Sequence, residues 1–226
     1  LANCLMSVGR FAEAAKVAED FLRSDASHIE MQMIRGAALA LSGDDAGARM
    51  QIGAVERAVR ARPEMALPLA NILALVGRYS DARGYFDAAK KRNPRDPAAH
   101  VGLARMQLAL GGFEESAGHA LDALEISQAL PEAHLVLGAA LAWYGDLPNA
   151  RTSLEFALRH DRGQLDAERW LALVTEKLGD HAAAALSREQ VARAHASIPF
   201  RPKDAPFGPA DFARKHEREK LVDIVR

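Results

Sequence analysis

The segment LGAALAWYGDLPNARTSLEFAL, residues 137–158, decides the fold of this chain. Its Gly145 separates two stretches rich in alanine and leucine, which are residues that lose little free energy in a helix. Glycine readily adopts the left-handed conformation that ends many helices, so the segment predicts a helix, a tight turn and a second helix. The stretches LANCLMSVGRFAEAAKVAEDFL (1–22) and LALVGRYSDARGYFDAAKKRNP (73–94) carry the same glycine in the same register.

This glycine recurs at one constant interval along the chain, as Gly9, Gly43, Gly77, Gly111, Gly145 and Gly179. Only small residues stand seven places before it: Ala2, Gly36, Ala70, Ala104, Gly138 and Ala172. The same holds five places after it, for Ala14, Ala48, Ala82, Ser116, Ala150 and Ala184. A period of about 34 residues accommodates two helices of about 14 residues, each about 21 Å long, and the small columns allow their backbones to approach closely. Aromatic residues two places after the glycine (Phe11, Tyr79 and Phe113) are expected to pack against the following repeat.

The pattern resembles the tetratricopeptide repeat family over residues 1 to 198, with a partial repeat 1–28 and repeats 29–62, 63–96, 97–130, 131–164 and 165–198. The resemblance implies an all-α fold, a right-handed superhelical solenoid of antiparallel helix pairs. The early tryptophan of the family pattern is absent, and we expect His100 and His134, which occupy its column, to act as packing residues. Pro68 falls inside a first helix, so that helix is expected to begin late or to kink.

The C-terminal region departs from the repeat pattern. Residues 199–209, PFRPKDAPFGP, contain four prolines and predict an extended linker. A helix is predicted from Ala210 to Val225, with Phe212 on its apolar stripe. We interpret residues 210–226 as a helix that caps the solenoid or, alternatively, as the start of a further domain. Because the chain starts at Leu1 within a helical pattern, we expect it to be a segment of a larger protein.

Composition narrows the classes of function. The 226 residues carry 29 Lys+Arg and 30 Asp+Glu, a net charge of −1, which gives no general attraction to nucleic acid or to an anionic membrane. No apolar run reaches the roughly 18 residues that membrane insertion requires. The single cysteine, Cys4, excludes an internal disulfide and is expected to be a buried packing residue. We place the protein in the cytoplasm.

Motifs that carry chemistry are not found. The sequence has no GxxxxGK[ST] loop, no GxGxxG and no GxSxG elbow. His216–Lys220, HEREK, lacks the second histidine of a zinc-binding HExxH helix. We therefore predict no enzyme activity, no cofactor and no metal site.

Function is expected to reside on a surface, because stacked helix pairs form a concave face lined by the first helix of each repeat. The resemblance implies that this face binds a protein or peptide through Met33, Leu41, Leu67, Asn71, Leu75, Val101, Arg105, Leu108, Leu135, Trp143 and Arg169. It also implies that Ala139, Ala142, Leu173 and Lys177 line the face. Trp143 is the expected anchor, since buried aromatic residues dominate binding hot spots; simple packing between helices is the alternative for this residue. The alternative for the whole face is that the chain's own tail or a neighbouring subunit covers the apolar lining.

Three functions from different classes remain after this reasoning. The first is a non-catalytic scaffold for protein–protein interaction. The second is a substrate-recruiting region of a larger transferase or hydrolase, an association that rests on fold alone. The third is a structural solenoid that self-associates.

Overall fold

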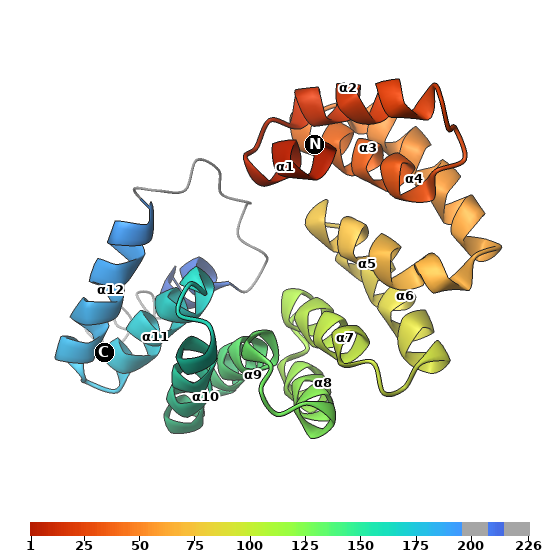
Figure 1. Ribbon diagram of the computed structural model, residues 1–226. Helices are drawn as coiled ribbons and strands as arrows, with labels where there is room; N and C mark the ends of the chain where they lie inside the picture. Colours follow the sequence, from red (N-terminus) through yellow and green to blue (C-terminus); the bar gives the residue numbers. More distant parts are fainter. Residues whose placement is uncertain (196–207, 215–226) are drawn as a thin grey trace, which may run out of the picture. The chain divides into compact units, whose positions relative to one another are not determined.

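The computed structural model describes residues 1–195 and 208–214, and all regular structure within these residues is helical (Figure 1). Residues Leu1–Pro94 form one compact unit, unit 1, and a second unit, unit 2, begins at Arg95. Unit 1 contains α1 (Ala2–Ser7), α2 (Phe11–Leu22), α3 (Ile29–Ser42), α4 (Asp45–Arg60), the 3₁₀ helix η1 (Pro63–Met65), α5 (Ala66–Leu75) and α6 (Tyr79–Arg92). Unit 2 contains α7 (Pro97–Ala109), α8 (Phe113–Ile126), α9 (Pro131–Tyr144), α10 (Leu147–His160), α11 (Leu165–Lys177), α12 (His181–His195) and a short helix over 209–214.

Consecutive helices pack as pairs within each unit, and this confirms the predicted all-α fold of helix pairs. In unit 1, α3 packs against α4 and α5 against α6, while in unit 2 the pairs are α7 with α8, α9 with α10 and α11 with α12. Additional contacts join α2 to α3 and α3 to α5 in unit 1, and α8 to α9 and α10 to α11 in unit 2. Each unit therefore has a core that continues from one helix pair to the next.

The two columns of small residues lie where the paired helices meet, as predicted. All twelve residues of these two columns are buried. The approach is closest at Gly138, where an added Cβ would lie 2.6 Å from Cγ of Leu154 on the partner helix. In the pair of α7 and α8 the hydroxyl of Ser116 donates a hydrogen bond of 2.8 Å to the carbonyl oxygen of Ala104, linking the two columns directly.

The recurring glycine adopts the predicted left-handed conformation at all six positions. Gly145 ends α9 with φ 99°, and its amide donates to the carbonyl oxygens of Leu141 and Ala142 at 3.0 and 3.2 Å. A residue with a Cβ is strained at this φ, which explains why glycine recurs.

After five of the six glycines, the next residue stabilises the start of the second helix in one of two ways, whereas Gly111 is followed by Gly112, which has no side chain to do so. Asp146 accepts a hydrogen bond from the amide of Asn149 and caps α10, whereas Arg78 pairs with Asp81 in the first turn of α6 at 2.6 Å. Asp44 and Asp180 repeat the cap, and Arg10 repeats the pairing with Glu13.

Several local expectations are settled by the structure. α5 begins late, at Ala66, so Pro68 falls in its first turn, where a missing N–H costs little. Cys4 is exposed, so the prediction that it is a buried packing residue is wrong. The described C-terminal helix begins at 209, one residue earlier than predicted, while residues 199–207 of the predicted linker and 215–225 of the predicted helix lie outside the described residues.

Candidate functional site: an aromatic cluster in unit 2

Four aromatic rings meet in unit 2, and we call Phe113, Trp143, Trp170 and Phe212 the aromatic cluster. Trp143 stacks on Phe113 with ring centroids 5.2 Å apart and an interplanar angle of 3°. Phe212 meets Trp143 edge-on at 5.3 Å and 89°, and meets Trp170 at 5.2 Å and 61°. Stacked and edge-to-face arrangements at these separations are the favoured geometries of aromatic pairs.

The repeat geometry brings the rings together. Phe113 is the first residue of α8 and Trp143 lies one residue before the end of α9, so both stand next to a turn. Their contact joins one repeat to the next, which confirms the predicted packing of this aromatic column for Phe113. Trp170 enters from the middle of α11 and is 3% exposed.

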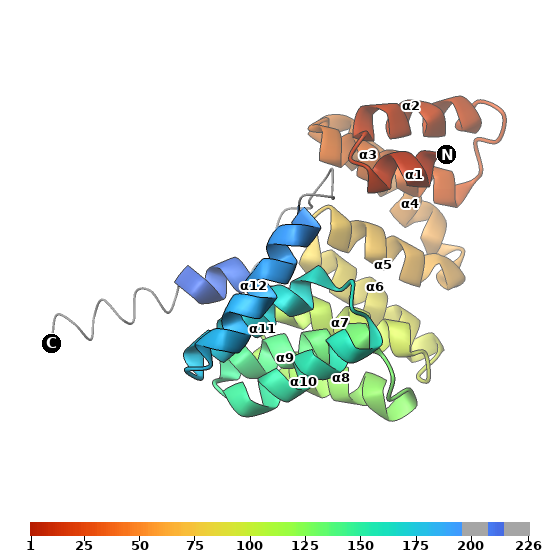
Figure 2. The ribbon, with the colours of Figure 1, turned by 60° about the vertical axis from the view of Figure 1, so that its left-hand side comes forward.

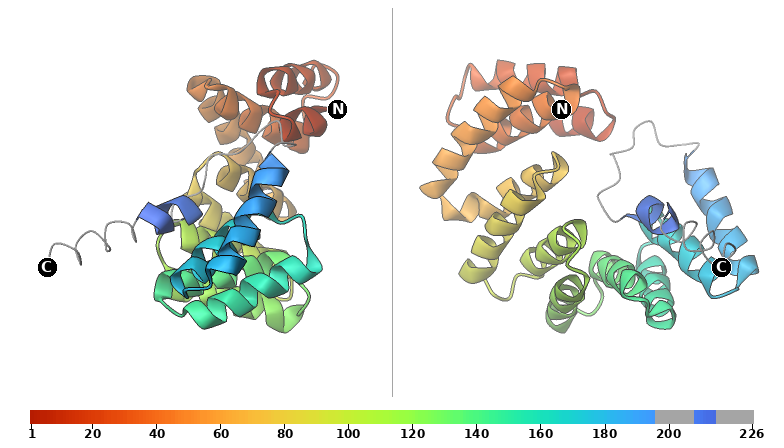
Figure 3. Two further views of the ribbon diagram at one scale, coloured as in Figure 1. Left: turned by 90° about the vertical axis from the view of Figure 1, so that its left-hand side faces the viewer. Right: turned by 180° about the vertical axis from the view of Figure 1, so that it is seen from behind.

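Phe212 comes from outside the repeats and is the most deeply inserted ring of the cluster, with an exposed fraction of 1%. It belongs to the same buried cluster as Ala139, Ala142 and Val174, while the Nζ atom of Lys177 lies 5.2 Å from the centre of its ring. Figures 2 and 3 show the short helix 209–214 beside α11. Burial of one phenylalanine contributes about 1.5–3 kcal/mol to holding the short helix at this position.

The predicted site residues of unit 2 fall into three groups. Leu108, Leu135 and Trp143 pack against the buried cluster that contains Phe212, so the structure brings these three together. Val101 is buried in a different cluster with Ala123 and Ala133. The two predicted arginines form ion pairs: Arg105 with Glu132 at 3.0 Å, and Arg169 with Asp166 at 3.1 Å.

The predicted site residues of unit 1 differ in their exposure to solvent. Met33 is buried, Leu41 and Leu67 are half-buried, and Leu75 is exposed. The side-chain amide of Asn71 donates to the carbonyl oxygen of Leu67 within its own helix at 3.2 Å. An open hollow elsewhere in this unit lies between α2 and α3 and is lined by charges of both signs, among them Lys16, Glu19 and Arg23.

Sequence reasoning identified Trp143, Ala139, Ala142, Leu173 and Lys177 as positions on one face and named covering by the chain's own tail as an alternative, but it did not single out Phe212 as the residue that inserts there. The available signal was the apolar stripe assigned to the C-terminal helix. Trp170 was also missed, because it lies on the side of α11 that the resemblance does not assign to the concave face.

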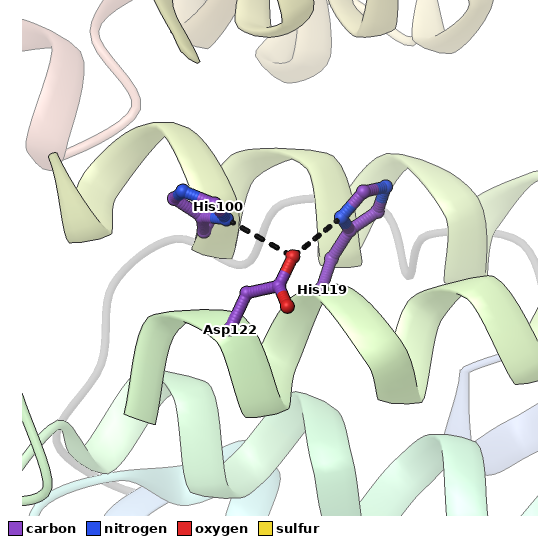
Figure 4. Close-up of side chains that lie close together, drawn as sticks. All are labelled: His100, His119 and Asp122. Carbon is purple, nitrogen blue, oxygen red and sulfur yellow. Dashed lines mark ion pairs between the residues drawn. The ribbon is translucent and has the colours of Figure 1, made fainter. Parts of the chain in front are cut away.

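A second group of side chains in unit 2 could hold a metal ion. One donor atom from each of His100, His119 and Asp122 lies within 4.8 Å of the other two, and Figure 4 shows the carboxylate of Asp122 between the two imidazole rings. His100 comes from α7 and is buried, whereas His119 and Asp122 come from successive turns of α8 and are half-buried. His100 is thus buried, as its expected packing role requires, and it also faces the carboxylate of Asp122.

Comparison with known proteins identifies the repeat. The family model described as "Tetratricopeptide repeat" matches residues 1–66 and 67–134, more than half of the chain. No curated protein sequence matches significantly. None of the helices within the described residues has both the length and the hydropathy needed to cross a membrane.

Solved structures share the fold at low sequence identity. PilW, titled a widely conserved type IV pilus biogenesis factor, aligns with TM-score 0.66 and 19% identity over 89% of this chain and 92% of its own. PilF from Pseudomonas aeruginosa aligns with TM-score 0.62 and 13% identity over 87% of this chain and 90% of its own. MamA from Desulfovibrio magneticus RS-1 aligns with TM-score 0.57 and 18% identity over 81% and 96%.

Proposed function

The chain belongs to the tetratricopeptide repeat family, and from this premise we propose that it is a protein-interaction scaffold, non-catalytic by itself, whose aromatic cluster binds a short partner segment. Stacked helix pairs of this family present side chains of successive first helices on one face. In unit 2 that face contains Trp143, Ala142 and Lys177. The same site would suit recruitment of a substrate protein in a larger transferase or hydrolase, because recruitment needs the same contacts.

The burial of Phe212 carries this proposal. A phenylalanine on a six-residue helix inserts between Trp143 and Trp170, against the small side chains of Ala139 and Ala142. The site therefore has the shape and apolarity to accept an aromatic side chain from a separate helical element. We infer that a partner supplies an equivalent aromatic residue on a short helix and competes with residues 209–214 for the site.

Lys177 adds a polar feature to the site. Its ammonium group lies over the ring of Phe212, a cation–π contact of about 0.5–1 kcal/mol at a solvent-accessible position. An acidic residue next to the aromatic residue of a partner would place a carboxylate near the same ammonium group. A partner segment with an aromatic residue flanked by Asp or Glu fits the site best.

A peptide added in trans tests the proposal. The probe is a fluorescent peptide of residues 205–218, APFGPADFARKHER, and binding is followed by anisotropy. Phe212→Ala in the full chain should bind this peptide at least about tenfold more tightly than the wild type, because a tethered segment competes at an effective concentration near the millimolar range. A peptide with alanine at position 212 should not bind.

Two double variants separate a specific site from general apolar binding. Trp143→Ala combined with Phe212→Ala should lose the peptide, whereas Tyr144→Ala combined with Phe212→Ala should keep it. Tyr144 is the matched control, since it neighbours Trp143 in α9 but is 71% exposed. Equal binding by both double variants, with unchanged helicity in circular dichroism, would contradict the proposal.

Self-association is the second candidate function, and it is favoured by the same contact. Because Phe212 lies outside the repeats, a second copy of the chain could supply this residue to the aromatic cluster. Light scattering over a range of concentrations should then show a dimer for the wild type and a monomer for Phe212→Ala. A monomer at every concentration would reject this candidate while leaving binding of a partner segment standing.

A further inference from the structure

We propose that His100, His119 and Asp122 form a binding site for a divalent transition-metal cation, and that Zn²⁺ is the ion that their chemistry suits best. The site lies on the pair of α7 and α8 and does not depend on the aromatic cluster. Two imidazole nitrogens and one carboxylate oxygen are common zinc ligands, and imidazole disfavours Mg²⁺ and Ca²⁺.

The distances between the donor atoms match the edges of a zinc coordination tetrahedron. The Nδ1 atom of His100 lies 3.4 Å from Oδ2 of Asp122, and the Nδ1 atom of His119 lies 3.5 Å from the same oxygen. Zinc–ligand bonds of about 2.0–2.1 Å at tetrahedral angles place neighbouring ligand atoms about 3.3–3.4 Å apart. Two of the three edges therefore have nearly the required length before a metal binds.

The third edge needs only a small adjustment. One donor atom from each of the three residues lies within 4.8 Å of the other two, so closing the third edge requires movement of one imidazole ring. His119 has room for this movement because its side chain is 24% exposed. His100, with a side-chain exposure of 7%, is the fixed member of the site.

The two contacts with Asp122 are longer than direct hydrogen bonds between an imidazole and a carboxylate. An imidazole N–H that donates to a carboxylate normally lies about 2.7–2.9 Å from the oxygen. Both contacts with Asp122 are longer, at 3.4 Å from His100 and 3.5 Å from His119. Nitrogens that coordinate a metal must instead be deprotonated and must direct their lone pairs toward one point. Figure 4 shows both rings with a nitrogen directed toward the carboxylate of Asp122.

The exposed side of the site leaves a position for a further ligand. Asp122 is 47% exposed, so one side of the cluster faces solvent. Three protein ligands and one position taken by water form the pattern of zinc sites that stay open to exchange. We infer that the bound ion clamps α7 to α8 and presents a water-accessible coordination position at the surface of unit 2.

Calorimetric titration of the full chain with Zn²⁺ tests the site. We expect one equivalent to bind with release of protons, and Mg²⁺ to give no heat of binding under the same conditions. His119→Gln and Asp122→Asn should each weaken binding by about tenfold or more, since loss of a ligand costs at least as much as loss of a supporting residue. Both substitutions change half-buried side chains, so the fold is expected to persist.

His181→Gln is the matched control, because His181 is an exposed histidine on a different helix pair that also lies beside a carboxylate, Glu176 at 3.3 Å. It should bind Zn²⁺ as the wild type does. Thermal melting gives a second measurement: Zn²⁺ should raise the Tm of the wild type and of His181→Gln by the same amount, and that of Asp122→Asn by less. Absence of binding by the wild type at 100-fold excess of Zn²⁺, or undiminished binding by a chain carrying both His119→Gln and Asp122→Asn, would overturn the proposal.

Discussion

Gly138→Ala tests how closely α9 and α10 pack. A Cβ at this position would lie 2.6 and 2.9 Å from Cγ and Cδ2 of Leu154, and 3.1 Å from the carbonyl oxygen of Ala150. Leu154 is fully buried, and the carbonyl oxygen belongs to the backbone of α10, so neither neighbour can move away alone. Overpacking of this kind costs about 1–3 kcal/mol, against a gain in helix propensity of about 1 kcal/mol. We expect a net loss of up to about 2 kcal/mol.

Gly118→Ala is the matched control on α8. Gly118 is also inside a helix, but an added Cβ meets no atom within 4 Å. The same chemical change should therefore stabilise the chain by about 0.5–1 kcal/mol through helix propensity alone. The two variants should differ by about 2 kcal/mol in the free energy of unfolding.

Tryptophan fluorescence during urea unfolding provides the assay. The chain has two tryptophans, Trp143 and Trp170, and both lie in unit 2, so their emission reports on the unit that contains both glycines. This choice of probe matters because a chain of two compact units need not unfold in a single transition. If Gly138→Ala proved as stable as Gly118→Ala, the close contact between α9 and α10 would be refuted.

Three further predictions follow from single contacts. Phe212→Ala should shift tryptophan emission to the red and lower the stability of unit 2 by about 1.5–3 kcal/mol, and an unchanged spectrum would argue against its insertion at Trp143. Asp146→Ala should cost about 1 kcal/mol in urea unfolding through loss of the cap of α10, and no loss would count against that cap. Burial lowers the pKa of His134 below its ordinary value near 6.5. The free energy of unfolding is therefore at its full value above pH 6.5 and falls as the pH drops through the lowered pKa. Between pH 7 and 5 it should change less for His134→Gln than for the wild type, and an identical pH dependence would contradict this.

Periodicity predicted the parts of the fold that depend on helix spacing. Side chains at the contact of two paired helices must be small, so the columns that include Gly138 and Ala150 could be recognised without a structure. The left-handed turn at Gly145 was equally accessible, because few other residues tolerate that conformation. Cys4 was misplaced because the buried face of α1 is taken by Ala2 and Leu5, which leaves Cys4 on the opposite side.

The candidate site was predictable only in part, for a related reason. A repeat pattern specifies contacts between neighbouring repeats, such as that of Phe113 with Trp143. Phe212 contacts Trp143 from a distant part of the sequence and lies outside the repeats. Its contact with Trp143 therefore cannot be predicted from the spacing of the repeats. The face was identified from the resemblance, and the chain's own tail was one of the occupants considered, whereas the choice of Phe212 required coordinates.

The metal-site proposal shows how one column can hold the same residue in two different environments. His100 and His134 occupy one column of adjacent repeats, and the sequence predicts the same packing role for both. The columns of His119 and Asp122 carry Ser153 and Phe156 in the next repeat. His134 accordingly lies against the ring of Phe156, with centroids 4.0 Å apart, where His100 faces the carboxylate of Asp122.

The environments of the two histidines therefore differ because the partner helix places a different side chain beside each of them, Asp122 beside His100 and Phe156 beside His134. Of the complete repeats, only 97–130 combines two histidines and an aspartate in these three columns. A ligand site that needs three columns at once is not recognised when each column is considered alone. Serine, phenylalanine and alanine satisfy the packing at the same positions in other repeats. Metal affinity that depends on His119 and Asp122 would mark 97–130 as a repeat whose helix pair acquired a second means of stabilisation without any change in the spacing that defines the fold.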